Sequence, residues 1–466
     1  MTKIKFGTDG WRAIIAKEYT VDNVIRVAHA TALFIKKKGG DAAVVGHDCR
    51  FGGPMFAEVT AQVMMAHGLK VYLAKGYVST PMVSLGVVRF NAYMGIVITA
   101  SHNPAEYNGY KLKASYGGPA IPADITAVEN LIPDNVPSLE LPALDKMEEA
   151  GMLEYVELER IYVEECKAKF DLDAINGSFI DLAYDAMYGA GQNVIRQLLN
   201  GVTEFHCEHN PDFSGQAPEP IHRNLTELSE YIANTDSVNV GLANDGDADR
   251  IGLYDEMGVF VDSHNILLLL IHYLHKYKGM KGKVVVTFSV TDKVRKLCEL
   301  YNIPFQVTQI GFKYIAEIMT HETVLVGGEE SGGIAAAGHI PERDGIWIGL
   351  ILMEFMAKTS KTLRELIEEV HALVGPFATD RDDLHLDNAL KLAIVENCKS
   401  GKYTTFGPYT IQRLEDLDGF KFYLNEDSWV MIRPSGTEPV LRVYAQAPDM
   451  QEVRKILDAT KAALLG

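Results

Sequence analysis

The stretch AVVGHDCRFGGPMFAEVTAQVMMAHGLKVYLA, residues 43–74, combines two hydrophobic patterns. Ala43 to His47 is a short apolar run typical of a buried strand, and Lys70 to Ala74 is a second such run. Between them, Pro54 to His67 has helical spacing and begins at a proline, which the first turn of a helix tolerates. A strand, a helix and a strand in this order predict a βαβ unit with parallel strands, and hence an α/β fold.

The same alternation continues through most of the chain. It predicts further strands at Met94 to Ala100, Phe179 to Asp185, Val238 to Asn244, Lys283 to Val290 and Thr323 to Gly327, and helices at Asp292 to Tyr301, Phe312 to Met319 and Thr362 to Val374. The Pro-rich, aperiodic stretch Leu131 to Leu144 indicates a boundary or linker. Residues 404–443 are strand-like, and Gln451 to Leu465 is a closing helix. The sequence therefore predicts three similar α/β blocks followed by a smaller α+β domain.

Length and charge limit the possible functions. A chain of 466 residues has room for about three domains at roughly 150 residues each, with two to four allowed. The 44 Lys and Arg residues against 62 Asp and Glu give a formal charge of −18. No basic run interrupts this acidity, so we expect no nucleic-acid partner. Small phosphorylated ligands are not excluded, because a few convergent cations or a metal can reverse the local field.

Cysteine usage and apolar content predict the compartment. The five cysteines (Cys49, Cys166, Cys207, Cys298 and Cys398) are far apart and form no CxxC pair, which predicts reduced thiols rather than a disulfide framework or a zinc site. The N-terminus has no apolar signal segment, and the longest apolar stretches, Ile266 to Ile271 and Ile346 to Met356, are too short to span a bilayer. We expect a cytoplasmic protein with no membrane partner.

Four segments of the sequence carry chemistry. The first is TASHNP, residues 99–104, which follows the apolar strand Met94 to Ile98. Ligands of open α/β sheets bind at the carboxyl ends of strands, so Ser101, beside His102, is placed to face a cleft as a nucleophile. The segment is not a G-x-S-x-G elbow, which disfavours an α/β-hydrolase. An ordinary Ser/Asn turn is the alternative interpretation.

The second segment is DGDADR, residues 245–250, which also follows a predicted strand. Its three carboxylates, Asp245, Asp247 and Asp249, stand at alternate positions and can direct their oxygens toward one hard cation, for which Mg²⁺ is expected. Arg250 can meet an anion beside the cation. A calcium EF-hand is disfavoured, because Arg250 replaces the glycine at loop position six. A solvated acidic turn is the other alternative, but it leaves three like charges uncompensated.

The third segment is GGEESGG, residues 327–333, after the strand Val324 to Val326. Its glycines allow the backbone to approach a ligand closely. Glu329 and Ser331 offer the acceptor and donor groups that recognise sugar hydroxyls. A flexible polar turn is the alternative.

The fourth segment is RPSGTEP, residues 433–439, in the C-terminal block. Arg433 can hold a phosphate with two hydrogen bonds, and Ser435, Gly436 and Thr437 can add hydroxyl and backbone N–H donors, which predicts a phosphate clamp. A β-turn punctuated by proline and glycine is the alternative. Together the four segments indicate a nucleophile, a metal, groups that recognise sugar hydroxyls and a phosphate clamp around one cleft.

In this order, the four segments closely resemble the signature loops of the α-D-phosphohexomutases, and FGTDGWRA at residues 6–13 resembles the opening of that family. The resemblance covers essentially the whole chain and is strongest to the phosphoglucomutase/phosphomannomutase branch. It implies an α/β protein of four domains around a central cleft: three related α/β/α domains with mixed sheets and a C-terminal α+β domain. We expect these domains at residues 1–140, 155–255, 256–372 and 378–466.

The resemblance also implies a role for each matching residue. Ser101 resembles the phosphoserine that carries the phosphoryl group, and an oxygen of its phosphate would complete the Mg²⁺ ligand set of Asp245, Asp247 and Asp249. The residues implied around the reacting phosphate are Arg12, His102, Lys111 and Arg250, with Lys111 and His102 as candidates for acid/base catalysis. Those implied in substrate binding are Gly311, Lys313, Glu329, Ser331, Arg433, Ser435, Gly436 and Thr437. The sequence departs from the pattern at Gly333, where several members carry a histidine, and His339 is the candidate replacement.

The implied activity is reversible phosphoryl transfer between the 1- and 6-positions of a hexose phosphate, through phospho-Ser101 and a hexose 1,6-bisphosphate. GEESGG, and TASHNP followed by NGYK, favour glucose and mannose phosphates. Phosphoglucosamine mutase is the alternative, although that branch usually carries GEQSGH. Two other classes are a sugar-bisphosphate phosphatase or synthase that uses the same serine and a catalytically silent sugar-phosphate binding protein. The expected partners are small sugar phosphates, and we expect a monomer or a homodimer.

Overall fold

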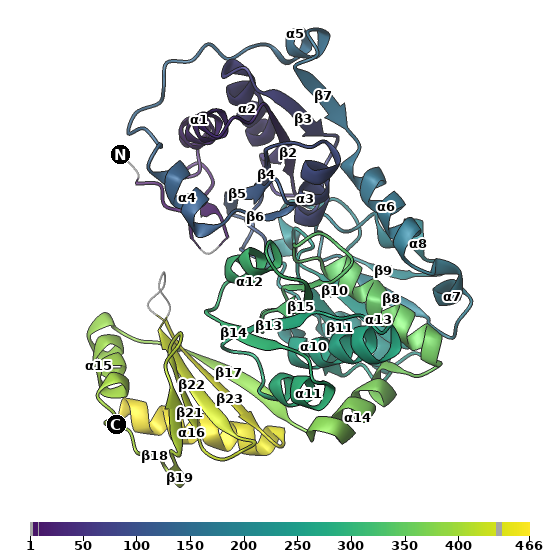
Figure 1. Ribbon diagram of the computed structural model, residues 1–466, viewed down its shortest axis with the longest axis vertical. Helices are drawn as coiled ribbons and strands as arrows, with labels where there is room; N and C mark the ends of the chain where they lie inside the picture. The colour runs from purple at the N-terminus through teal and green to yellow at the C-terminus, as the bar shows by residue number, and fades with distance from the viewer. Residues whose placement is uncertain (1–2, 8, 435–439) are drawn as a thin grey trace. The chain divides into compact units, whose positions relative to one another are not determined.

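The computed structural model describes residues 3–7, 9–434 and 440–466 (Figure 1). Contacts among these residues divide the chain into two compact units. The first unit comprises Met1–Val285 and Gly311–Leu366, and the second comprises Val286–Ile310 and Ile367–Gly466. Among the described residues, no helix has both the length and the apolar content that crossing a membrane requires.

The first α/β block of the first unit contains the predicted βαβ stretch. Its elements are β1 (Trp11–Ile14), α1 (Val21–Lys37), β2 (Ala42–His47), α2 (Gly53–Ala66), β3 (Lys70–Ala74), α3 (Thr80–Arg89), β4 (Met94–Ile98), β5 (Tyr107–Ala114), β6 (Gly118–Pro119), α4 (Pro122–Glu129), α5 (Leu144–Glu149) and β7 (Leu153–Val156). The strands have the order β1-β5-β4-β2-β3-β7. β2 pairs in parallel with β3 and β4, and β5 pairs antiparallel with β4 and β1, so the sheet is mixed.

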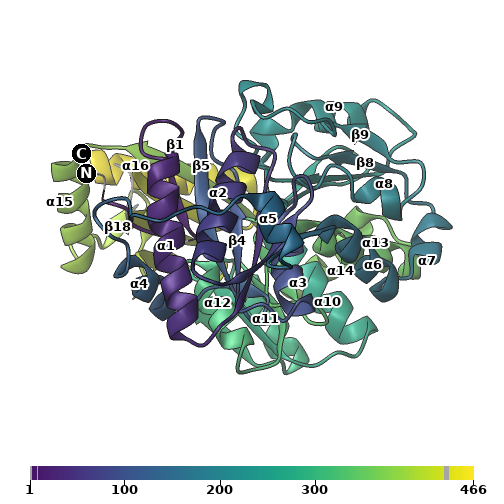
Figure 2. The same ribbon diagram turned by 90° about the horizontal axis from the view of Figure 1, so that it is seen from above.

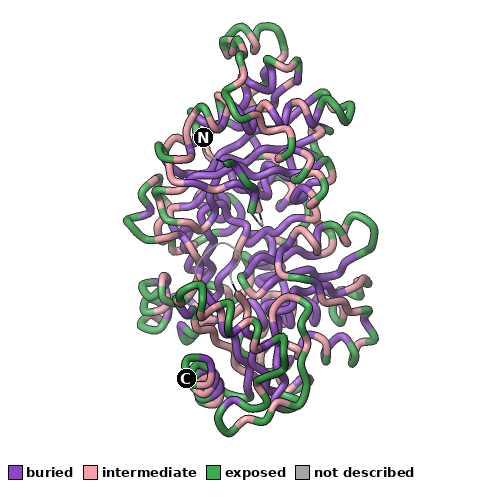
Figure 3. Tube along the Cα trace, turned by 90° about the vertical axis from the view of Figure 1, so that its left-hand side faces the viewer, coloured by how far each residue is buried: buried purple, intermediate pink, exposed green. Residues whose placement is uncertain are grey.

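Helices cover both faces of this sheet. α1 and α2 contact each other and share one hydrophobic cluster with the strands, including the fully buried Val45 and Ile96 (Figure 2). α3 packs against β2, β4 and β5 on the other face (Figure 1). Every residue of β2 and β4 is buried, as expected for strands covered on both sides. In Figure 3 buried stretches of the trace run through the interior, and exposed residues gather at the outer bends.

The second block repeats the mixed-sheet plan. Its elements are α6 (Leu158–Lys169), α7 (Leu172–Asn176), β8 (Leu182–Asp185), α8 (Ile195–Leu198), β9 (Thr203–Phe205), α9 (Thr226–Ala233), β10 (Val240–Asn244), β11 (Ile251–Tyr254) and β12 (Phe260–Val261). The strand order is β12-β11-β10-β8-β9. β8 pairs in parallel with β9 and β10, whereas β11 pairs antiparallel with β10. The predicted strand at residues 179–185 is shorter than expected, because β8 begins at Leu182.

The third block follows. Its elements are α10 (Ser263–His272), a π-helical turn (Tyr273–Tyr277), β13 (Lys283–Thr287), α11 (Lys293–Tyr301), β14 (Phe305–Thr308), α12 (Phe312–Met319), β15 (Val324–Gly328), β16 (Ile334–Ala336), α13 (Gly345–Thr359) and α14 (Leu363–Val374). β15 pairs antiparallel with β16. α13 begins where Asp344 accepts a hydrogen bond from the Trp347 backbone N–H at 3.0 Å, a normal N-cap.

One topological feature recurs in the three blocks and positions the chemistry. β4, β10 and β15 are each followed by an antiparallel partner, namely β5, β11 and β16. The segments at residues 99–104, 245–250 and 329–333 are the connections in these three pairs. The prediction that each of these segments follows a strand is therefore confirmed.

The second unit contains the α+β block together with residues 286–310 of the third block and most of α14. Its elements after α14 are β17 (Ala378–His385), α15 (Asn388–Lys399), β18 (Thr405–Phe406), β19 (Tyr409–Thr410), β20 (Arg413–Glu415), β21 (Phe420–Tyr423), β22 (Trp429–Pro434), β23 (Val440–Ala447) and α16 (Met450–Leu465). The main sheet, β17-β23-β22-β21-β20, is entirely antiparallel. The strand-like region and the closing helix are as predicted, whereas β17 and α15 were not expected from the hydrophobic pattern.

Candidate active site

The serine of the first segment has an unusual backbone conformation. Ser101 is 1% exposed and has φ 54°, in the left-handed region that costs a residue with a side chain roughly 1 kcal/mol or more. Its hydroxyl donates to Asp245 Oδ2 at 2.7 Å and lies 3.3 Å from His102 Nδ1. The strained turn after β4 therefore directs the Ser101 hydroxyl toward the acidic segment of the second block.

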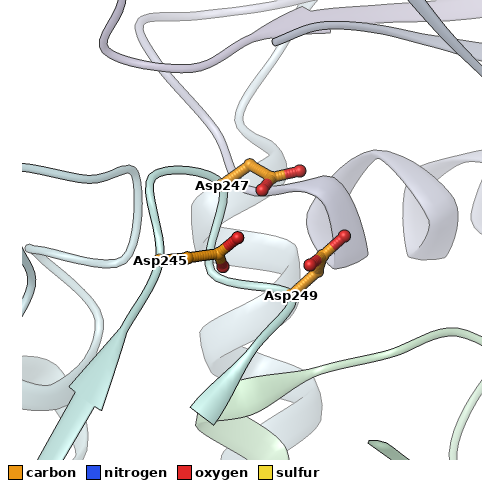
Figure 4. A group of neighbouring side chains, drawn as sticks. All are labelled: Asp245, Asp247 and Asp249. Atoms are coloured by element: carbon orange, nitrogen blue, oxygen red, sulfur yellow. The ribbon is translucent and has the colours of Figure 1, made fainter. Parts of the chain in front are cut away.

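The three aspartates of that segment form one cluster (Figure 4). One carboxylate oxygen from each of Asp245, Asp247 and Asp249 lies within 4.8 Å of the others, and all three side chains are fully buried. The backbone of this segment approaches the serine loop so closely that a Cβ on Gly246 would lie 2.6 Å from Ser101 O. Only glycine fits at that contact.

Two cations, Lys111 and Arg343, offset part of the negative charge of this cluster. Lys111 on β5 is fully buried, and its Nζ lies 2.7 Å from Asp247 Oδ2, 3.0 Å from Asp249 Oδ2 and 2.8 Å from Asp9 Oδ2. Arg343 donates to Asp249 Oδ2 at 2.6 Å and also to Asp9 Oδ2. The side chain of Arg343 is 6% exposed. The cluster is thus a dense, buried network of opposite charges.

The charges of this network shift the pKa values of its members. Burial and the like charges of Asp247 and Asp249 raise the pKa of Asp245 well above its usual range. Burial acts in the same sense on Asp247, but the Lys111 ammonium, the Thr80 hydroxyl and Arg343 together outweigh it and lower the Asp247 pKa. Burial would lower the pKa of Lys111, yet the neighbouring carboxylates, with Asp9 among them, raise it. Lys111 therefore keeps its proton in this arrangement.

The cluster fits a hard divalent cation. Asp247 Oδ1 and Asp249 Oδ1 are buried and have no hydrogen-bond partner among the described residues. Unpaired buried carboxylate oxygens are costly, and a metal ion is one of the few groups that satisfies several of them at once. The Ser101 hydroxyl, bonded to Asp245, borders the same space. Three carboxylates and a serine oxygen are oxygen donors of the kind that Mg²⁺ and Ca²⁺ prefer.

Arg343 also lies against Gly333, the position at which several members of the family carry a histidine. A Cβ on Gly333 would lie 2.5 Å from Arg343 Cδ, so the arginine fills the space that a side chain at position 333 would need. His339, the candidate replacement for the family's histidine, contacts Asp344 and Trp347. Its Nε2 lies 2.9 Å from Asp344 Oδ2, and its ring stacks on Trp347 with centroids 3.7 Å apart. Arg343, which lies against Gly333, extends into the charged cluster.

The remaining residues predicted around the reacting phosphate border Ser101. His102 is half-buried, and burial, together with the nearby arginines and Lys111, lowers its pKa well below the usual value, so the imidazole is neutral. Arg12 on β1 donates to Asn103 Oδ1 at 2.6 Å in the serine loop. The backbone N–H of Arg250 donates to Asp245 Oδ1 at 3.0 Å, and its guanidinium lies 3.7 Å from Glu219.

The two predicted sugar-binding segments of the first unit meet directly. Gly311 N donates to Glu329 Oε1 at 3.0 Å, and burial raises the pKa of Glu329, whose Oε2 lies 3.8 Å from Arg343 NH1. Ser331 is exposed in the turn after β15. The Lys313 ammonium lies on α12 over the Tyr314 ring, 5.4 Å from its centroid.

The predicted phosphate clamp lies in the second unit. Arg433 stands one residue before the end of β22, where its Nε donates to Asp418 Oδ1 at 3.1 Å. Asp418 Oδ2 also accepts from the Ile310 backbone N–H at 2.8 Å. Ser435, Gly436 and Thr437 lie outside the described residues. The structure thus gives Arg433 a carboxylate partner and leaves the rest of the clamp a prediction.

Sequence reasoning missed several residues of this site. Asp9 and Arg343 carry much of the charge balance, and Thr80, at the start of α3, donates its hydroxyl to Asp247. Asp9 stands inside the opening FGTDGWRA, which was itself a usable signal. Arg343 and Thr80 stand in segments with no distinctive spacing, and only the contacts between blocks bring them to the cluster.

Known protein families match the chain domain by domain. Four family models match: phosphoglucomutase/phosphomannomutase alpha/beta/alpha domain I at residues 3–137, domain II at 160–258, domain III at 262–373, and the C-terminal domain at 407–463. The domain bounds expected from the sequence alone remain predictions. The fold prediction of three α/β/α domains with mixed sheets and a C-terminal α+β domain is confirmed.

Individual relatives match over nearly their whole length. A structure from Thermus thermophilus, assigned as a phosphomannomutase, is 35% identical, covers 100% of both chains and has a TM-score of 0.87. The phosphoglucomutase/phosphomannomutase of Thermococcus kodakarensis is 28% identical over 459 residues, 97% of this chain and 96% of the relative. The phosphoglucosamine/phosphogalactosamine mutase of Sulfurisphaera tokodaii is 29% identical over 483 residues, 99% of each.

The four domains and the serine beside a three-aspartate cluster define a phosphohexomutase, an intramolecular phosphotransferase of the isomerase class. Within that class, the chain belongs to the phosphoglucomutase/phosphomannomutase family.

Proposed function

We propose that this protein interconverts the 1- and 6-phosphates of glucose and of mannose through phospho-Ser101 and a hexose 1,6-bisphosphate. The observation that carries the proposal is the position of the Ser101 hydroxyl, which is buried and bonded at 2.7 Å to one carboxylate of the three-aspartate cluster. A solvated turn would not bury a strained serine against acidic groups.

The metal site is part of this proposal. Asp245, Asp247 and Asp249 would hold Mg²⁺ together with an oxygen on Ser101. When bound, the cation offsets negative charge on the transferred phosphoryl group. Arg12 and Arg250 border the same space and would offset the charge of its other oxygens. Lys111, now bonded to two of the proposed ligands, would compensate the aspartates when no metal is bound.

The phosphoryl group would move between two oxygens. The bond from phosphorus to Ser101 Oγ breaks as a bond to the sugar O6 of a hexose 1-phosphate forms, and a base takes the hydroxyl proton of that O6. The bisphosphate then turns end for end and returns its 1-phosphate to Ser101. We assign proton transfer to His102 rather than Lys111, because His102 Nδ1 lies 3.3 Å from Ser101 Oγ whereas the Lys111 ammonium bonds to Asp247 and Asp249.

Binding of the sugar and of its distal phosphate completes the proposal. Glu329 and Ser331 would bind sugar hydroxyls, with Gly311 and Lys313 in the adjoining segment. The bond between Gly311 N and Glu329 supports this pairing of the two segments. The distal phosphate would be held by Arg433, Ser435, Gly436 and Thr437. Such a clamp must accept either phosphate position, since the intermediate reverses.

Phosphoglucosamine mutase is the second candidate. Several relatives carry that name, among them a phosphoglucosamine mutase from Halalkalibacterium halodurans that is 28% identical over 478 residues. The sequence GEESGG and the relative from Thermococcus kodakarensis favour glucose and mannose phosphates. The sugar 1-phosphate that the protein converts fastest distinguishes the two candidate functions.

The test is ³¹P NMR of the purified protein with Mg²⁺ and a trace of hexose bisphosphate. Glucose, mannose and glucosamine 1-phosphates are presented separately to wild type, to Ser101→Ala and to Ser229→Ala, a control serine that donates to Gly258 O in the second block. We expect 6-phosphates from wild type and Ser229→Ala only. Inorganic phosphate or accumulated bisphosphate as the sole product would instead establish a phosphatase or synthase. Binding without turnover would establish a sugar-phosphate binding protein, and turnover by Ser101→Ala would refute the phosphoserine.

A further inference from the structure

A buried ion pair lies directly behind the serine loop. Asp48 and Arg50 stand in the turn between β2 and α2, where they are 1% and 2% exposed, and Arg50 Nε lies 3.2 Å from Asp48 Oδ2. Burial raises the pKa of Asp48 to about 6 although Arg50 and Thr99 lower it. Burying such a pair is costly, so its presence calls for a reason other than stability.

Arg50 binds the backbone of the serine loop at four points. Its acceptors are the carbonyl oxygens of Ser101 at 2.6 Å and Asn103 at 2.6 Å from NH2, and of Pro104 at 2.8 Å and Tyr107 at 3.0 Å from NH1. Three of these carbonyls belong to the loop after β4, and the fourth belongs to Tyr107, the first residue of β5. The planar, five-donor guanidinium suits this pattern, and a lysine ammonium with three donors does not. The Phe213 ring covers Arg50, 4.9 Å from Cζ to the ring centroid.

Asp48 reaches the same serine from its other side. Thr99 Oγ1 donates to Asp48 Oδ2 at 2.5 Å and accepts from the Ser101 backbone N–H at 2.9 Å. Both the C=O and the N–H of Ser101 are therefore fixed by one buried pair, directly by Arg50 and through Thr99 by Asp48. A backbone at φ 54° persists only when its surroundings hold it there, and these contacts do so.

We propose that Asp48 and Arg50 are positioning residues for phosphoryl transfer, which hold Ser101 in the left-handed conformation that directs its hydroxyl at Asp245. Both act through the backbone, since the hydroxyl itself bonds to Asp245 and lies beside His102. The expected loss of turnover rests on the proposed function of Ser101, whereas the expected loosening of the serine loop does not. The two can therefore be tested separately.

The kinetic test compares two conservative substitutions of buried arginines in the first block. Arg50→Lys keeps the charge but loses the fork that binds four carbonyls. The matched control is Arg26→Lys, because Arg26 is 5% exposed and its Nε also donates to a backbone carbonyl, Pro133 O at 2.7 Å. We expect Arg50→Lys to lower kcat roughly 100-fold, since displacing a reacting group by about 1 Å costs this much. KM should stay near the wild-type value, and Arg26→Lys should keep its kcat.

The geometric test does not need activity. Hydrogen exchange followed by mass spectrometry should show faster exchange of the amides in residues 99–109 in Arg50→Lys and wild-type exchange in Arg26→Lys. If Arg50→Lys does not fold, Thr99→Val leaves Arg50 in place. It removes the two hydrogen bonds that link the Ser101 N–H to Asp48 and should lower kcat roughly tenfold. If wild type has no mutase activity, the proposed function fails, and the exchange result alone judges the positioning role.

Three results would overturn the inference. One is turnover within about twofold of wild type in a folded Arg50→Lys or Thr99→Val protein. Another is an equal loss of kcat in Arg26→Lys, which would reveal a general effect of destabilising the first block. The third is unchanged exchange at residues 99–109 in the Arg50→Lys protein.

Discussion

Replacing Lys111 by methionine isolates the electrostatic balance of the aspartate cluster. The substitution keeps the length of the side chain and removes an ammonium that lies within 3.0 Å of three carboxylates, including those of Asp247 and Asp249. Removing one partner of a buried ion pair costs roughly 3–5 kcal/mol. Arg343 still bonds to two of the carboxylates, so we expect Lys111→Met to lower the free energy of unfolding by about 3 kcal/mol, the lower end of this range. At about 1.4 °C per kcal/mol for a unit of this size, Tm in EDTA should fall by roughly 4 °C.

Mg²⁺ should recover most of this loss. A ligand at 100 times its Kd stabilises the folded state by about 2.7 kcal/mol, and the variant no longer has the lysine that competes for the same oxygens. The matched control is Lys113→Met. Lys113 stands two residues further along β5 and is fully buried. Its Nζ lies 2.8 Å from Glu342 Oε2 and 3.8 Å from Asp9 Oδ1, and among the described residues it forms no ion pair with Asp245, Asp247 or Asp249. The Tm of Lys113→Met in EDTA should lie below that of wild type. Mg²⁺ should raise the Tm of this variant by no more than it raises the Tm of wild type.

Scanning calorimetry of wild type and both variants, in EDTA and in saturating Mg²⁺, measures these effects. The reasoning fails if Lys111→Met melts at the wild-type temperature in EDTA, because the ammonium would then not be needed to balance the cluster. It also fails if Mg²⁺ stabilises the Lys111 and Lys113 variants equally, since the carboxylates left unpaired at position 111 would then not be metal ligands.

Three further outcomes are expected. Gly333→Ala should cost about 1–3 kcal/mol in denaturant unfolding, because its Cβ would lie 2.5 Å from Arg343 Cδ, and the cost should shrink in an Arg343→Ala background. The hydrogen bond with Asp185 raises the pKa of His206, so the stability from this pair is present below about pH 6.5 and lost as pH rises through the higher folded value. The Tm difference between wild type and His206→Gln should therefore narrow above neutral pH, and a constant difference would contradict this. Asp245→Asn should abolish the Tm increase that Mg²⁺ gives wild type, and a retained increase would place the metal elsewhere.

The sequence alone predicted many of the strands and helices and the residues with functional groups. Hydrophobic periodicity located β2, α2 and β3 because a strand covered on both faces and a helix with one buried face have different apolar spacing. Ser101 and the three aspartates of residues 245–250 could be proposed because each segment follows a strand, where α/β sheets bind ligands. The prediction missed α15, whose hydrophobic pattern is weak, with only Ile394 and Cys398 buried.

Tertiary structure decided which charges balance and how the serine is held. Lys111, Asp9 and Arg343 are far apart in the sequence, and their ion pairs with the cluster follow from contacts between blocks that no local pattern records. The exclusion of a side chain at residue 333 depends on Arg343 in the same way. Arg50 stands near the end of β2 with no motif around it, yet it holds four carbonyls of a loop about fifty residues later. Spacing along the chain determines which face of an element a side chain occupies, whereas a buried charge is matched only by groups that the fold brings within hydrogen-bond distance.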